Sequence, residues 1–155
     1  MKLSWQMSIS EGATLITFVG VLDEESGLEA LPPLSGKVTF DLSGVSRMNS
    51  DGIRRWINFL RSLVAVNDLT FVRCSVPAVR QLNFTLGFQG KAKVESFYAP
   101  YACVETGEEE ERLLKTSDIK DPLHPPTFPV KGGLMEFCDV PERYFAFLQE
   151  KPKAP

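Results

Sequence analysis

Residues 37–64, KVTFDLSGVSRMNSDGIRRWINFLRSLV, join a strand pattern to a helix pattern through one short polar turn at residues 49–52. Before the turn, Val38, Phe40 and Leu42 alternate with other side chains, which predicts a strand with one buried face. After the turn, apolar residues recur at helical spacing and predict an amphipathic helix of about three turns. The apolar stripe of this helix consists of Ile53, Trp56, Ile57, Leu60, Leu63 and Val64.

The polar turn also carries the signals of a helix start. Asn49 or Ser50 can serve as the N-cap, because either side chain can accept a hydrogen bond from a free backbone N–H group of the first turn. Asp51 then lies within the first turn, where a negative charge suits the helix dipole. The polar face of the predicted helix carries Arg54, Arg55, Asn58 and Arg61.

A strand, Asp-Leu-Ser-Gly-Val at 41–45, Met-Asn-Ser-Asp-Gly-Ile at 48–53 and an amphipathic helix together resemble the core of STAS domains. This family includes bacterial anti-sigma-factor antagonists, and its turn commonly reads Asp-Ser-x-Gly-Leu with a serine that a partner kinase phosphorylates. Ser50 matches that serine and Gly52 matches the glycine. Asn49 stands where aspartate is common, and Asp51 stands where a small hydroxyl residue is common.

The resemblance implies that Ser50 is phosphorylated and that a partner binds to the turn and the helix after it. The partner-binding residues that it implies are Met48, Asn49, Ser50, Asp51, Gly52, Arg54, Arg55, Asn58 and Arg61. From the residues themselves, Ser50 can equally be a helix cap and the arginines a solvated helix face.

The remaining predicted elements complete a small α/β domain. They are strands at 5–9, 14–21, 69–74 and 93–104, a short helical turn at 24–31, and a second helix from Ser75 to Gly87. The apolar stripe of the second helix is Val79, Leu82 and Leu86, and Ser75 is its expected cap. The order β-β-β-α-β-α-β predicts a STAS-like mixed sheet with helices packed on one face.

We predict that the STAS-like domain covers residues 1–100 and that residues 101–155 form a small C-terminal extension. The acidic run at 108–111 reads as a solvated helix segment, and a proline-rich stretch follows at 121–129. A short helix is expected to start near Pro141, with an apolar side made of Tyr144, Phe145 and Leu148. So many aromatic side chains indicate that the extension folds back onto the domain.

The extension is also similar to zinc-ribbon extensions, in which two Cys-x-x-Cys knuckles flank a linker. Residues 103–106, Cys-Val-Glu-Thr, keep one thiol of the first knuckle, and residues 128–133, Phe-Pro-Val-Lys-Gly-Gly, have the shape of the second without a thiol. A structural zinc ion needs four nitrogen or sulfur ligands. We therefore predict a degenerate ribbon held together by packing, with no metal and no other cofactor.

Composition restricts the class of protein. A chain of 155 residues with 43% hydrophobic and 24% charged residues is ordinary globular composition. The net charge of -3 argues against a general nucleic-acid binder. No apolar run approaches the roughly 20 residues that cross a bilayer, and the first residues lack a signal-peptide core, so we expect a cytoplasmic protein. Cys74, Cys103 and Cys138 are odd in number and widely spaced, which fits reduced thiols.

No nucleophile and base, phosphate loop or pair of catalytic carboxylates appears in the sequence, and the single His124 has no serine or cysteine partner at a suggestive spacing. We therefore expect a non-catalytic module that binds an anti-sigma factor, a serine kinase or another signalling protein through residues 48–61. The alternative is a phosphorylation-independent scaffold of a signalling complex. In that alternative Asp51 supplies a fixed charge, and residues 144–148 contribute to docking.

Overall fold

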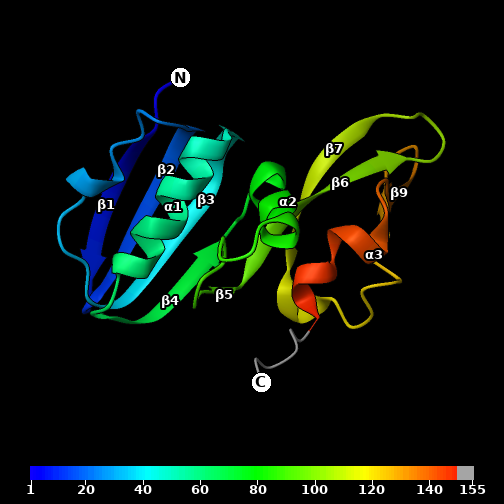
Figure 1. Cartoon of the computed structure of the whole chain (residues 1–155). Helices are drawn as coiled ribbons and strands as arrows, with labels where there is room; N and C mark the ends of the chain where they lie inside the picture. The colour runs from blue at the N-terminus through cyan, green and yellow to red at the C-terminus, as the bar shows by residue number, and fades with distance from the viewer. Residues whose placement is uncertain (150–155) are drawn as a thin grey trace.

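The structure is a computed structural model that describes residues 1–149, and it contains two β-sheets (Figure 1). The first sheet has the strand order β1-β2-β3-β4-β5. Strand β1 is antiparallel to β2, and the other neighbours are parallel, so the sheet is mixed as expected. Its strands are β1 (Ser4–Ser10), β2 (Ala13–Leu22), β3 (Gly36–Met48), β4 (Val66–Val72) and β5 (Lys93–Val94).

Helices α1 (Ser50–Ser62) and α2 (Val76–Phe84) pack on the same face of the first sheet. Their side chains Trp56 and Ala78 line one small cavity of about 10 Å³ together with Phe18 of β2 and Leu42 of β3. The short 3₁₀ helix η1 (Leu28–Ala30) lies in the segment predicted as a helical turn. The chain is therefore a mixed α/β protein.

The two predicted helix stripes are too long at their C-terminal ends. Trp56 and Leu60 are buried on α1, but Val64 lies beyond the end of the helix and is 87% exposed. Likewise Val79 and Leu82 are buried on α2, whereas Leu86 is 92% exposed because the helix ends at Phe84. Each helix stops before the periodic pattern in the sequence does.

The strand predicted at residues 93–104 is divided between two sheets. Its first residues form β5, which pairs with β4, and after Glu95 the chain continues as β6 (Ser96–Cys103) of the second sheet. Strand β4, the neighbour of β5, ends at Val72, because the next residue, Arg73, adopts a left-handed backbone with φ 51°. The predicted single strand is therefore wrong, and the predicted domain boundary at residue 100 falls inside β6.

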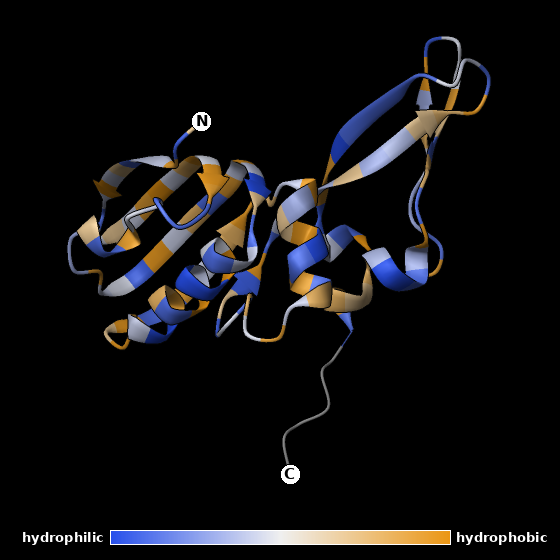
Figure 2. Ribbon diagram, turned by 45° about the horizontal axis from the view of Figure 1, so that its top comes forward, coloured by the Kyte–Doolittle hydropathy of each residue, from blue (hydrophilic) through white to orange (hydrophobic). Residues whose placement is uncertain are grey.

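The second sheet is antiparallel, with the order β7-β6-β9-β8. Its other strands are β7 (Glu109–Lys115), β8 (Phe128–Val130) and β9 (Gly133–Phe137), and the 3₁₀ helix η2 (Thr116–Asp118) follows β7. The acidic run was expected to be helical, but Glu109–Glu111 begin β7, which is mostly hydrophilic (Figure 2). Pairing with β6 makes it a strand, because its backbone groups complete the ladder from Ala102↔Glu109 to Ser96↔Lys115.

After the second sheet, the described chain ends with α3 (Pro141–Tyr144) and the 3₁₀ helix η3 (Ala146–Leu148). Tyr144, Phe145 and Phe147 are buried, and Leu148 is partly buried against the same core. This confirms that the extension packs against the rest of the chain, although Phe147 was not predicted to take part. Because these three aromatic side chains are buried, they are not available for the docking that the scaffold alternative expected of residues 144–148. Residues 150–155 of the predicted extension lie outside the described residues.

Candidate functional site

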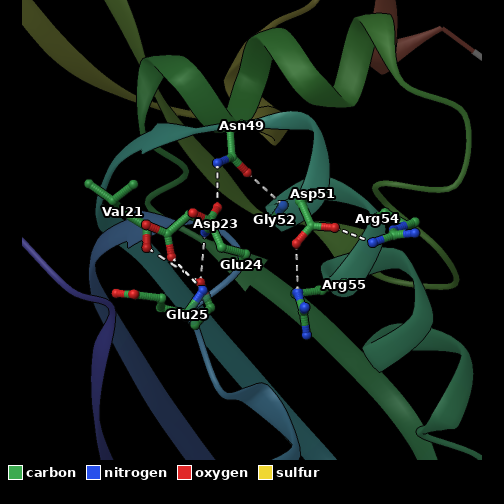
Figure 3. A network of polar contacts seen from close by, with 10 residues as sticks. Val21, Asp23, Glu24, Glu25, Asn49, Asp51, Gly52, Arg54 and Arg55 are labelled. Carbon is green, nitrogen blue, oxygen red and sulfur yellow. Dashed lines mark hydrogen bonds and ion pairs between the residues drawn. The ribbon is translucent and has the colours of Figure 1, made fainter.

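The candidate site is the turn between β3 and α1 together with the exposed face of α1. Asn49 is the N-cap of α1, because its Oδ1 atom accepts a hydrogen bond of 2.8 Å from the backbone N–H of Gly52. The same side chain donates from Nδ2 to Glu24 Oε2 at 2.8 Å (Figure 3). Asn49 therefore caps the helix and ties it to the loop that leaves β2.

Gly52 lets the turn lie directly against the end of β2. A Cβ atom at this position would lie 2.0 Å from the carbonyl oxygen of Leu22, far inside any van der Waals contact. In addition, the backbone N–H of Asn49 donates to the same carbonyl oxygen at 3.1 Å. The turn is thus held by backbone contacts that leave no room for a side chain at residue 52.

Ser50 is the first residue of α1 and is exposed to solvent. Asn49 takes the cap role that the sequence left open between the two residues, so Ser50 is not needed as a cap. Within residues 1–149 no partner holds the Ser50 hydroxyl by a hydrogen bond. Its side chain is therefore accessible at a helix N-terminus, where the free N–H groups and the helix dipole favour an anion.

The charge next to Ser50 is already balanced. The Asp51 carboxylate pairs with Arg54, and its Oδ2 atom lies 3.0 Å from Arg55 Nε (Figure 3). The hydrogen bond from Arg55 is the main cause that lowers the pKa of Asp51, and the same bond raises the pKa of Arg55. The hydrogen bond from Asn49 likewise lowers the pKa of Glu24. At neutral pH the turn therefore carries the carboxylates of Glu24 and Asp51 and the guanidinium groups of Arg54 and Arg55, and Arg61 adds a third guanidinium group farther along α1.

The predicted partner-binding residues do not all reach the surface. Asn49, Ser50, Arg54, Arg55, Asn58 and Arg61 are exposed, and Asp51 is partly exposed. Met48 is partly buried against the core, and Gly52 is buried, so these two residues shape the turn rather than present a side chain. In the described part of the chain, Arg61 forms no ion pair, which leaves its charge available at the surface.

Sequence reasoning missed the acidic loop beside the turn. Glu24 reaches the site through Asn49, although 25 positions separate the two residues. Next to it, Asp23 Oδ1 accepts a hydrogen bond from the backbone N–H of Glu25, and the backbone N–H of Asp23 donates to Ser26 Oγ. No local pattern links residues 23–26 to residue 49, since the contact depends on the parallel pairing of β2 with β3.

The two segments that are similar to zinc-ribbon knuckles, residues 103–106 and 128–133, lie side by side in the second sheet. Glu105 Oε2 accepts a hydrogen bond of 2.9 Å from the backbone N–H of Leu134 and lies 3.6 Å from Cys103 Sγ. Among the described residues, no three His, Cys, Asp or Glu side chains gather as candidate metal ligands. His124 contacts the exposed Asp121, with 2.6 Å between Nδ1 and Oδ2.

Neither a scan of protein-family models nor a search of curated proteins finds a match to this chain. Of the helices formed by residues 1–149, none is both long enough and apolar enough to cross a membrane.

Proposed function

We propose that this protein is a cytoplasmic, non-catalytic regulatory module of the STAS type, similar to an anti-sigma-factor antagonist. It binds a partner kinase or another signalling regulator through the turn and helix at residues 48–61. The observation that carries the proposal is the exposed Ser50 hydroxyl, which is released from the capping role by Asn49 and lies beside the exposed face of α1.

Phosphorylation of Ser50 would change the charge of this surface. A phosphoserine carries about -1.5 to -2 charges at neutral pH. The backbone N–H groups of the first turn favour that charge, but Glu24 and Asp51 are close to it and repel it. Because a partner that fits the unmodified turn would have to desolvate this added charge, phosphorylation weakens binding. In the unmodified turn, the carboxylates of Glu24 and Asp51 together offset the guanidinium groups of Arg54 and Arg55.

The proposal is tested by comparing the partners that tagged variants capture from cells of the source organism. Wild type and Ser50→Ala should capture the same amount of one regulator. Ser50→Asp should capture about tenfold less of it, a loss typical of a charge placed inside an interface. Ser8→Asp is the matched control, because Ser8 is an exposed serine on β1. Equal capture by Ser50→Ala, Ser50→Asp and Ser8→Asp would contradict the switch.

The pairing of Asp51 favours a second candidate function. Since Arg54 and Arg55 hold this carboxylate in one position, the turn presents the same fixed set of charged groups whether or not Ser50 is modified. A scaffold that binds its partner without phosphorylation would use this charge and the exposed Asn58 and Arg61. It would retain its partner in Ser50→Asp and lose it in Arg61→Glu, which is the reverse of the pattern expected for the switch.

A further inference from the structure

A small hollow lies where the C-terminal end of α1 meets the loop that follows α2. Its volume is about 260 Å³, below the roughly 300–1,000 Å³ of pockets that hold drug-sized ligands, so it suits a single side chain. The loop packs tightly on α1 at Gly90, where a Cβ atom would lie 3.3 Å from Leu60 Cδ1. The apolar part of the lining consists of Ile57, Leu60, Leu63, Val64, Gly87 and Gly90.

Two large apolar side chains beside this hollow are exposed. Val64, in its lining, is 87% exposed, and Leu86, the neighbour of Gly87, is 92% exposed. Scattered exposed apolar residues are common, but apolar residues gathered around one hollow mark an interaction surface. A side chain that enters the hollow would therefore bury apolar area that this chain leaves in water.

The charged residues in the lining are both cations, Arg61 and Lys91. Both are exposed, and within residues 1–149 no carboxylate pairs with either of them. The ammonium group of Lys91 is held in place, because it donates to the carbonyl oxygen of Leu63 at 2.8 Å and to that of Val66. An ammonium group has three donors, so one N–H of Lys91 remains available for a ligand.

These two charges exceed what α1 itself needs at this end. The dipole of a helix places about half an elementary negative charge at its C-terminus, and the two cations more than offset it. The hollow therefore combines apolar walls with positive charge and has no carboxylate in its lining. We call it the cationic hollow.

We infer that the cationic hollow binds an acidic segment of a protein partner, which inserts one large apolar side chain. Carboxylates next to that side chain pair with Arg61 and with the remaining donor of Lys91, because a lining of one charge sign selects the opposite sign. A nucleic acid would match the cations but would leave the apolar walls uncovered. The inference does not rest on the proposed function, since Ser50 lies at the other end of α1, about 15–20 Å along the helix axis. Of the predicted partner-binding residues, the cationic hollow includes only Arg61.

Binding is tested with the full chain and a fluorescently labelled synthetic peptide in which glutamates flank a single phenylalanine. Fluorescence anisotropy should show saturable binding of this peptide to wild type. A peptide with serine in place of the phenylalanine, and one with lysines in place of the glutamates, should each bind at least about tenfold more weakly. These two comparisons separate the apolar anchor from the charge.

Variants of the chain locate the binding site. Val64→Ser and Arg61→Glu should each weaken binding of the phenylalanine peptide at least about fivefold, the first through lost apolar contact and the second through reversed charge. The matched controls are Val104→Ser, at a valine that is 59% exposed, and Arg143→Glu, at an exposed arginine of α3, and both should bind like wild type. Because all four side chains are exposed, thermal unfolding of each variant should match that of wild type.

Three results would overturn the inference. The first is a wild type that does not bind the phenylalanine peptide saturably, and the second is equal binding by Val64→Ser, Arg61→Glu and their controls. The third is another occupant of the cationic hollow, shown by tighter binding of an oligonucleotide of the same charge as the peptide or by a dimer of the chain that excludes the peptide.

Discussion

At the scale of single residues, the candidate site depends most on Gly52. Its backbone lies against the carbonyl of Leu22, and no side chain fits between them. On helix propensity alone, replacing this glycine with alanine would stabilise α1 by about 0.5–1 kcal/mol. The contact acts in the opposite direction, because a Cβ atom 2.0 Å from a backbone oxygen forces the turn away from β2.

We therefore predict that Gly52→Ala lowers the free energy of unfolding by about 1–3 kcal/mol, the usual cost of overpacking. Urea unfolding followed by circular dichroism measures this. Ser50→Ala, an exposed substitution two residues earlier, should stay within about 0.5 kcal/mol of wild type. A Gly52→Ala variant as stable as Ser50→Ala would show that the turn does not lie against β2 as described.

The sequence predicted this turn well but not its surroundings. The cap and the exposed arginines follow from local rules, because each depends on residues within one helical turn. The glycine was matched only through the resemblance to STAS domains, since its contact with the carbonyl of Leu22 is not local. The bond between Asn49 and Glu24 could not be predicted, since it requires the ends of β2 and β3 to lie side by side.

At the scale of elements, one side chain attaches the C-terminal helices to α2. Asn83 donates from Nδ2 to the carbonyl oxygen of Tyr144 at 2.7 Å, and its Oδ1 atom accepts from the backbone N–H of Phe147 at 2.7 Å. Both backbone groups lie where buried aromatic side chains limit access to water. Asn83 therefore satisfies polar groups that α3 and η3 cannot satisfy themselves.

Asn83→Ala should destabilise the protein by about 1–3 kcal/mol, because both backbone groups lose their partner. Hydrogen exchange should accelerate in residues 141–149 before it does in the first sheet. Asn58→Ala, an exposed asparagine on α1, is the matched control and should change neither quantity. If exchange in residues 141–149 stayed at the wild-type rate in Asn83→Ala, the attachment would not depend on this residue.

Helices were easier to predict than the strands of the second sheet. The stripes on α1 and α2 repeat within the helices themselves, whereas β7 has no apolar alternation over its acidic first half. Its conformation comes from pairing with β6, and its charges suit an edge strand, since they discourage further pairing. The break between β5 and β6 was missed because an aromatic run does not reveal a change of sheet.

At the scale of the whole molecule, the two sheets meet at Cys74. Its backbone N–H donates to the carbonyl oxygen of Ser96 at 3.1 Å, and its carbonyl oxygen accepts from the backbone N–H of Tyr98 at 2.8 Å. Beside it, Arg73 Nη1 lies 3.4 Å from Oδ2 of the buried Asp41, and Arg73 Nη2 donates to the Tyr98 hydroxyl at 3.2 Å. These contacts join the first sheet to β6 of the second.

The thiol of Cys74 should therefore report whether the sheets separate. Burial raises its pKa to about 12, so the reactive thiolate is scarce at neutral pH. With a thiol reagent, the native protein should show one fast-reacting cysteine, the exposed Cys138, while Cys74 and the buried Cys103 react only on unfolding. Peptide mapping of the labelled sites checks this. Labelling of Cys74 as fast as Cys138 would mean that the two sheets open independently.

The central claim is that Ser50 is the regulated residue of a binding surface. The most direct test is mass spectrometry of the protein purified from its own cells, with peptide mapping across residues 47–54 at several stages of growth. We predict that a fraction of the chains carries one phosphate on Ser50 and that the fraction changes with growth conditions. An unmodified Ser50 under every condition would contradict the switch and leave the constitutive scaffold as the better account.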